Sequence, residues 1–278
     1  MKTQLCYDNV QQIANDFNAV LTLPSLTIQQ RFQIDDAWLT AFKHNAHIPN
    51  IEAYEGNRRL GFYYQWLWLQ LINAHPDYAL VAEEVQLNWQ NQTIGAIDFL
   101  VENLRSNEVE HWEVAIKFYL AYQGQWLGPN ANDNLDKKTA RMVDHQLRLT
   151  EHPAYQTVLQ SQYGLIRHKR LIMQGRLFDC IDDKQQGSNI AINPATVNGK
   201  WCFKHQAIAL TKQHYQFFTL SKPQWICPPR HSTKTQKKSP YLELDQLTTP
   251  TQAIDQNDQV WFIVPDHWPL HNNDLIAK

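Results

Sequence analysis

Residues 93–119 read TIGAIDFLVENLRSNEVEHWEVAIKFY, and this stretch decides the fold. Its pattern predicts two β-strands joined by a polar connection, with Asp98 on the first strand and Glu113 and Lys117 on the second. Because side chains alternate across a strand, Glu113 and Lys117 share one face, while the apolar residues that alternate with them fill the other. An unpaired charge is expensive to bury, so we expect one face of the sheet to be core and the other to carry chemistry.

If the two strands pair as neighbours, the carboxylates of Asp98 and Glu113 approach each other. Two carboxylates with a lysine nearby form an oxygen-ligand pocket that suits Mg²⁺ or Mn²⁺. We therefore expect a metal-dependent active site in which Asp98 and Glu113 are the metal ligands. The alternative is an ion pair between these carboxylates and Lys117 that closes one edge of the sheet.

Length and composition limit the class of protein. A chain of 278 residues with 43% hydrophobic content is long enough for one large domain or two modest ones. The net charge of −2 excludes a generally basic nucleic-acid coat, so contact with phosphates requires a local patch. We find no stretch near the ~18 apolar residues of a membrane helix, no signal-peptide pattern and no CxxC pair, so we expect no membrane association and a cytoplasmic location.

Hydrophobic periodicity divides the chain into three parts. Residues 1–55 predict a helical lead-in, and residues 179–278 predict a smaller mixed α/β lobe with strands at WCFKH, HYQFFTL and QVWFIV. Residues 56–178 predict an α-β-β-β-α-β core between them. In this core we expect helices near 58–74 and 134–149 and strands near 79–89, 94–101, 110–118 and 169–178.

A cationic stripe follows the second core helix. Its four members lie three or four residues apart, which places them on one helix face: Lys137, Arg141, His145 and Arg148. Viewed alone, such a stripe is typical of a solvated surface. Beside the carboxylate strands it can hold phosphates, so the sequence indicates a nucleic acid as partner and names no protein partner.

Other reactive side chains are weaker candidates. Two pairs with the spacings C-x2-H and C-x3-H suggest a tetrahedral zinc site: Cys202, His205, Cys227 and His231. The orientations within the first pair oppose each other and prolines stiffen the second, which disfavours zinc. Four further histidines fit surface or cap positions better than a catalytic set: His75, His111, His145 and His168. The loop RHSTKTQKKSP contains Arg230 and three lysines, and we expect it to be exposed.

Three segments resemble a known family. WEVAIKFYL, WLGPNANDNLDKKTARMVDHQLRL and QGRLF look like the bacterial family called domain of unknown function 1853, over nearly the whole chain. This resemblance implies a fold and no established activity.

The α-β-β-β-α-β core also resembles the PD-(D/E)xK phosphodiesterase superfamily, which implies a restriction-endonuclease-like core. In that superfamily an acidic residue on the second strand and an acidic-x-Lys element on the third hold the catalytic metal, which here implies roles for Asp98, Glu113 and Lys117. Ala115 stands where the superfamily has its lysine, and four residues from Glu113 to Lys117 span roughly 13 Å. Many relatives carry a metal-facing glutamate in the first helix, and Gln65 occupies the corresponding position here.

Two functions follow from these features. The first is metal-dependent phosphodiester hydrolysis of a nucleic acid, in which Lys117 positions the attacking water or stabilises charge on the phosphate. The alternative is a non-catalytic module that binds nucleic acid or protein and keeps the nuclease-like fold.

Overall fold

The computed structural model describes residue 7 and residues 9–182, 190–230 and 240–270. Within these residues nine strands form one mixed sheet in the order β1-β2-β3-β5-β6-β9-β8-β7, with β4 paired to β3. The strands are β1 (Tyr78–Trp89), β2 (Gln92–Asn103), β3 (Glu108–Tyr122), β4 (Gln125–Leu127), β5 (Ile166–Cys180), β6 (Val197–Phe203), β7 (Phe217–Thr219), β8 (Thr251–Asp255) and β9 (Val260–Val264). The pairs β3·β5, β5·β6 and β6·β9 are parallel and the remaining pairs are antiparallel. The predicted mixed α/β class is confirmed.

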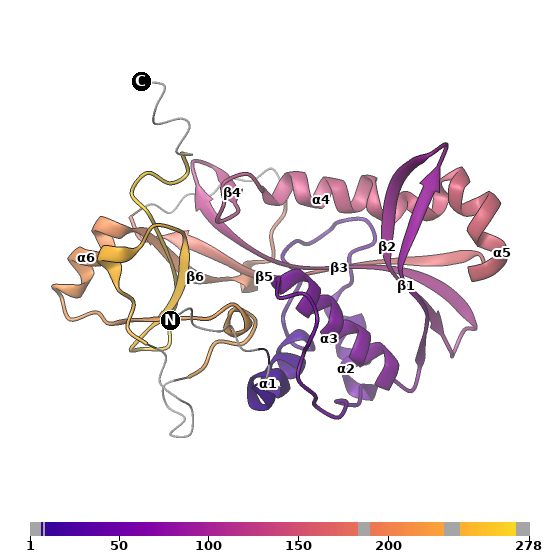
Figure 1. Ribbon diagram of the computed structural model, residues 1–278, viewed down its shortest axis with the longest axis horizontal. Helices are drawn as coiled ribbons and strands as arrows, with labels where there is room; N and C mark the ends of the chain where they lie inside the picture. The colour runs from indigo at the N-terminus through magenta and orange to yellow at the C-terminus, as the bar shows by residue number, and fades with distance from the viewer. Residues whose placement is uncertain (1–6, 8, 183–189, 231–239, 271–278) are drawn as a thin grey trace.

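Helices cover both faces of the sheet (Figure 1). They are α1 (Val10–Val20), α2 (Asp36–Asn45), α3 (Leu60–Ala74), α4 (Leu135–Asp144), α5 (Gln160–Tyr163) and α6 (Lys204–Thr211). Helices α1, α2 and α3 lie on one face of the strands β3 and β5, and α4 lies on the opposite face (Figure 1). No helix among the described residues is long and apolar enough to cross a membrane.

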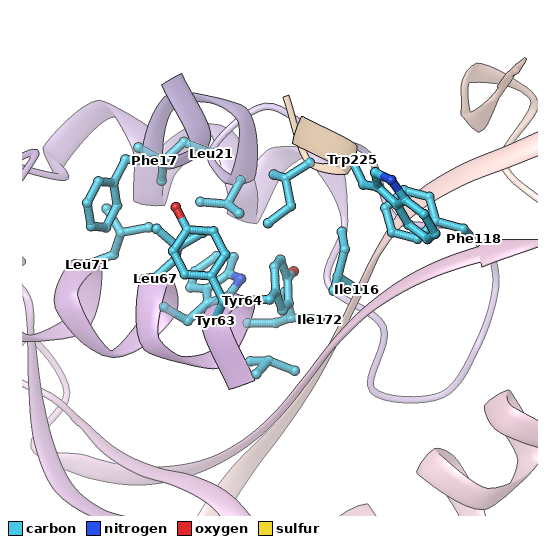
Figure 2. Packing of buried hydrophobic residues seen from close by; sticks show 14 of the residues in the cluster. Phe17, Leu21, Tyr63, Tyr64, Leu67, Leu71, Ile116, Phe118, Ile172 and Trp225 are labelled. Atoms are coloured by element: carbon cyan, nitrogen blue, oxygen red, sulfur yellow. The ribbon is translucent and has the colours of Figure 1, made fainter. Parts of the chain in front are cut away.

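The face toward α1, α2 and α3 holds the largest hydrophobic cluster. Alternate residues of β3, namely Trp112, Val114, Ile116 and Phe118, belong to it, as the strand pattern predicts. Figure 2 shows the neighbouring side chains of α1 and α3, where Phe17 packs near Leu71. The sheet face predicted to be core is therefore the core.

The opposite face of β3 packs against α4 through a smaller cluster that includes Ala115, Tyr119 and Met142. This helix begins after Asn134, whose side chain accepts hydrogen bonds from the first free backbone N–H groups. It ends at Asp144 and continues as a 3-10 turn, Gln146–Glu151, so the predicted helix 134–149 is too long as an α-helix. The last two members of the cationic stripe consequently lie beyond the helix.

The predicted core elements otherwise match α3, β1, β2, β3 and β5 in type and order. The lead-in contains α1 and α2, and its irregular segment is tied to β5 through bridges such as Ser25 with Gln174. Strands β6, β7 and β9 fall near the three predicted strand segments, whereas α6 and β8 were not predicted. All four C-terminal strands continue the sheet of the core.

A glycine on β5 permits the close approach of β3 and β5 beside Lys117. Gly175 has φ +147 and pairs with Lys117, and a Cβ atom there would collide with the Lys117 carbonyl group. Gly175→Ala should lower the free energy of unfolding by at least about 2 kcal/mol, because it adds both backbone strain and a clash. Urea denaturation measures this change.

The matched control is Gly61→Ala at the start of α3, where a Cβ atom meets nothing within 4 Å. Alanine there should stabilise the protein by roughly 0.4–1 kcal/mol. Equal effects of the two substitutions would contradict the described packing of β3 on β5.

Candidate active site

Strands β2 and β3 diverge where the predicted carboxylates stand. Their pairing runs from Asn103 opposite Glu108 to Phe99 opposite Trp112 and stops there. Beyond this point β2 continues with β1, and β3 continues with β5. Asp98 and Glu113 are the next two residues in the register, so they face each other at the divergence.

Each carboxylate accepts a hydrogen bond from the backbone of the other strand. The Val114 N–H donates to Asp98 Oδ2 at 2.9 Å, and the Asp98 N–H donates to Glu113 Oε1 at 3.3 Å. The two side chains thus satisfy N–H groups that the divergence frees. This reciprocal arrangement fixes the two carboxylates beside each other, as the sequence predicted.

Burial makes this pair a poor place for two negative charges. Glu113 is 1% exposed, and burial raises its pKa to about 8. Burial, followed by repulsion from Glu113, raises the pKa of Asp98 well above its usual range. Near neutral pH the pair therefore favours a bound proton, or a cation that takes the place of that proton.

His111 lies beside the pair, two residues before Glu113 on the same face of β3. It is fully buried, and its Nε2 atom lies 2.8 Å from Glu113 Oε1. Burial lowers the pKa of His111 to about 3, so the imidazole is neutral. Its Nδ1 atom has no hydrogen-bond partner among the described residues. The prediction of a surface or cap position is wrong for His111, although His75 and His145 do cap α3 and α4 and His168 is exposed.

The lysine whose charge affects the pKa of Glu113 is Lys138 of α4. Lys117 shares the predicted face but donates to Asp133 Oδ2 at 2.7 Å, which also accepts from Tyr119 at 3.3 Å. The positive charge that lowers the pKa of Glu113 belongs to Lys138. Burial lowers the pKa of Lys138, as does repulsion from Lys117. An ion pair between Lys117 and the two carboxylates is therefore absent.

A third carboxylate, that of Glu84 on β1, acts on the pair formed by Asp98 and Glu113. The register places Glu84 opposite Asp98, between the pairs Glu83 with Phe99 and Val85 with Ile97. The charge of Glu84 contributes to the raised pKa of Asp98 and of Glu113.

Gln65 of α3 donates a hydrogen bond to the Glu84 side chain. Gln65 is therefore linked to the carboxylate pair only through Glu84. Glu84 itself has a positive φ of 50, a strained conformation for a residue other than glycine. The sequence did not single out Glu84 as a site residue, because its place beside Asp98 depends on the register of β1 with β2.

The remaining sequence candidates do not join this site. Cys202 is a buried residue of β6, while His205 lies at the surface with Nδ1 2.8 Å from Asp266 Oδ1. His231 and the three loop lysines lie outside the described residues. In the described part of the chain no group of three His, Cys, Asp or Glu side chains is arranged to hold a metal ion.

The cationic stripe lies at the surface. Lys137 and Arg141 are exposed on α4, and His145 is exposed at its end. Arg148 is also exposed and pairs with Glu151 at 3.0 Å. The stripe thus begins on the helix that carries Lys138.

A family model described as domain of unknown function (DUF1853) matches residues 9–264. The chain belongs to the DUF1853 family. No curated protein and no solved structure matches this chain significantly. The family resemblance of the three sequence segments is confirmed, and the chemistry of this DUF1853 protein has to be argued from its own residues.

The carboxylate pair should make stability depend on pH. Between the ordinary pKa of 4.5 and the folded value of about 8, the folded protein keeps a proton on Glu113 that the unfolded chain has lost. The free energy of unfolding should therefore fall as pH rises through this range, by an amount on the order of a few kcal/mol. Glu113→Gln, which cannot ionise, should flatten the fall in chemical denaturation series between pH 4.5 and 9.

A second buried acid requires a control. Burial raises the pKa of Asp16 on α1 to about 8, and its titration contributes a fall of the same sign. The comparison is therefore made in wild type and in Asp16→Asn, where the effect of Glu113→Gln should persist. An unchanged slope in both backgrounds would show that Glu113 ionises normally.

Proposed function

We propose that this DUF1853 protein is a Mg²⁺- or Mn²⁺-dependent phosphodiesterase acting on a nucleic acid, with Asp98 and Glu113 holding the cation. One observation carries the proposal: two buried carboxylates lie side by side with raised pKa values. Such a pair is stabilised by whatever positive charge enters between its members.

The residues present suit Mg²⁺ better than zinc. Protein sites for Mg²⁺ use one or two carboxylates and complete the coordination shell with water and substrate phosphate oxygens. Asp98 and Glu113 supply two carboxylates, and Glu84 adds negative charge one strand away. A cation bound here would polarise a phosphate and lower the pKa of an attacking water.

The surrounding side chains have separate roles in this proposal. Lys138 brings a partly buried ammonium group that stabilises negative charge developing on the phosphate. His111, which is fully buried, holds Glu113 in place through its 2.8 Å hydrogen bond. Lys117 is held in an ion pair by Asp133 and is not the catalytic lysine.

The chain order supports a relationship to the PD-(D/E)xK superfamily. Helix α3 precedes the antiparallel strands β1, β2 and β3, and α4 then leads to β5, which is parallel to β3. This is the α-β-β-β-α-β order implied by the sequence resemblance. The acidic residues lie on its second and third strands, where that superfamily holds its metal.

The second candidate is a module that binds nucleic acid without cleaving it. It is favoured by Gln65, a neutral amide that is bonded to Glu84, and by the missing third ligand in the described residues. In this case the carboxylate pair holds a proton and closes the divergence of β2 and β3.

Hydrolysis separates the two candidates. Asp98→Asn and Glu113→Gln should abolish cleavage of fluorescently labelled DNA or RNA oligonucleotides in Mn²⁺, because each removes a ligand charge. Lys138→Met should lower kcat by roughly 10²–10³-fold, as expected for loss of a group that stabilises transition-state charge.

Lys117→Met is the matched control, since it removes a lysine of the same face that is bonded elsewhere. It should cost less than about tenfold in kcat. A wild-type protein inactive on DNA and RNA with both Mg²⁺ and Mn²⁺ would favour the binding module, and equal losses for the two lysines would remove the role given to Lys138.

A further inference from the structure

A polar cavity opens at the first residues of β5, on the sheet face that packs against α4. It has a volume of about 470 Å³ and lies between the 3-10 turn Gln146–Glu151 and the first residues of β5. We call it the β5 pocket. Six of its lining residues offer a charge, an aromatic ring or a hydroxyl group to a ligand: Arg31, Phe32, Thr150, Glu151, Arg167 and Lys169. None of these residues takes part in the proposed hydrolytic site.

The irregular segment before α2 brings two of these residues to the pocket. The Leu171 N–H of β5 donates to the Phe32 carbonyl oxygen at 2.8 Å, which ties this segment to the sheet. The Phe32 ring then lies 4.4 Å from the Arg31 guanidinium carbon and 5.4 Å from Lys169 Nζ. Two cations are thus held at one aromatic ring.

Strand β5 supplies the other cations. The register of β3 with β5 shifts between Val109 and Glu110, so Arg167 is the extra residue of a β-bulge. Bulges re-aim a side chain, and here the bulged residue lines the pocket. Lys169 pairs with His111 on β3, and its side chain is only 11% exposed.

The pocket has an excess of positive charge. Arg31, Arg167 and Lys169 contribute three positive charges, and Glu151 contributes one negative charge with Oε1 2.6 Å from Lys169 Nζ. The difference, three minus one, leaves two positive charges. Thr150 adds a hydroxyl group that is buried at 7% exposure and has no hydrogen-bond partner in the described part of the chain.

This combination fits a phosphate monoester. Such a group has about two negative charges at neutral pH and three acceptor oxygens, whereas a phosphodiester within a strand has one charge. Arginine forks bind phosphate oxygens in pairs, and the Thr150 hydroxyl can donate to a third. The charge balance therefore favours the end of a phosphorylated strand over its interior.

We propose that the β5 pocket binds the terminal phosphate of a nucleic-acid strand and so directs the carboxylate pair to phosphorylated ends, an inference that rests on the proposed function. Lys169 lies one strand and two residues from Glu113. At about 4.8 Å between strands and 3.3 Å per residue, their Cα atoms are roughly 8 Å apart. This separation matches two to three nucleotides of a stacked strand at about 3.4 Å each.

Binding without catalysis tests the proposal. Fluorescein-labelled oligonucleotides of one sequence, bearing a 5′-phosphate, a 3′-phosphate or hydroxyl groups at both ends, are titrated with the protein in EDTA at fixed salt. One phosphorylated end should bind at least about tenfold more tightly than the hydroxyl-ended strand. Arg31→Ala combined with Arg167→Ala should abolish this preference, and both residues are exposed, so the fold should tolerate the change.

The cationic stripe provides the matched control. Lys137→Ala combined with Arg141→Ala should weaken binding of all three oligonucleotides by a similar factor, because it removes contacts along the strand and leaves the pocket intact. Equal binding of the three strands by wild type overturns the proposal. If inorganic phosphate or a nucleoside monophosphate binds while the strand end makes no difference, the pocket serves a small phosphorylated molecule and the strand-end proposal is also overturned. A preference for phosphorylated ends without hydrolysis in any metal supports the pocket and refutes the proposed catalytic function.

Discussion

The reciprocal hydrogen bonds between Asp98 and Glu113 are the interaction on which the rest of the structure depends. Strands β2 and β3 part at these residues, and each carboxylate accepts an N–H from the facing strand. Without them the divergence would leave buried backbone groups unsatisfied. The same burial that makes these bonds valuable raises both pKa values, so structure and reactivity have one origin.

The divergence also organises the surrounding elements. Helix α4 crosses the opened face and brings Lys138, and the following turn brings Gln146, whose side chain donates to the Ala96 carbonyl oxygen at 3.3 Å. On the other side of β3, the close approach at Gly175 lets β5 run parallel to β3 through a long pairing that begins at Val109 with Ile166, where β5 lines the cationic β5 pocket. One face of the sheet around β3 thus holds the largest aromatic core, and the other holds the buried carboxylate pair beside a smaller hydrophobic cluster.

The alternation of apolar and polar residues in the sequence correctly predicted which face of β3 is core and which residues share a strand face. The face of Trp112 became core, and Asp98 met Glu113 because two strands joined by a short turn pair as neighbours. The failures concern distances that sequence spacing does not determine. Lys117 bonds to Asp133 sixteen positions away, and Lys138, adjacent to the predicted stripe, turns inward because Thr139 and Met142 set the buried face of α4. The place of Glu84 follows only from the register of β1 with β2. His111 was misjudged because its burial depends on the strands that flank β3, where it pairs with Leu100 and Lys169.

Calorimetric titration of the apo protein with Mn²⁺ at pH 7, in two buffers of different ionisation enthalpy, tests the central claim most directly. If the buried pair holds a proton that the cation replaces, the two heats should differ by an amount corresponding to about one proton released per Mn²⁺ bound. Asp98→Asn should remove most of the binding heat, and Lys117→Met should not. Absence of binding heat in wild type, or binding that Asp98→Asn leaves intact, would contradict the account.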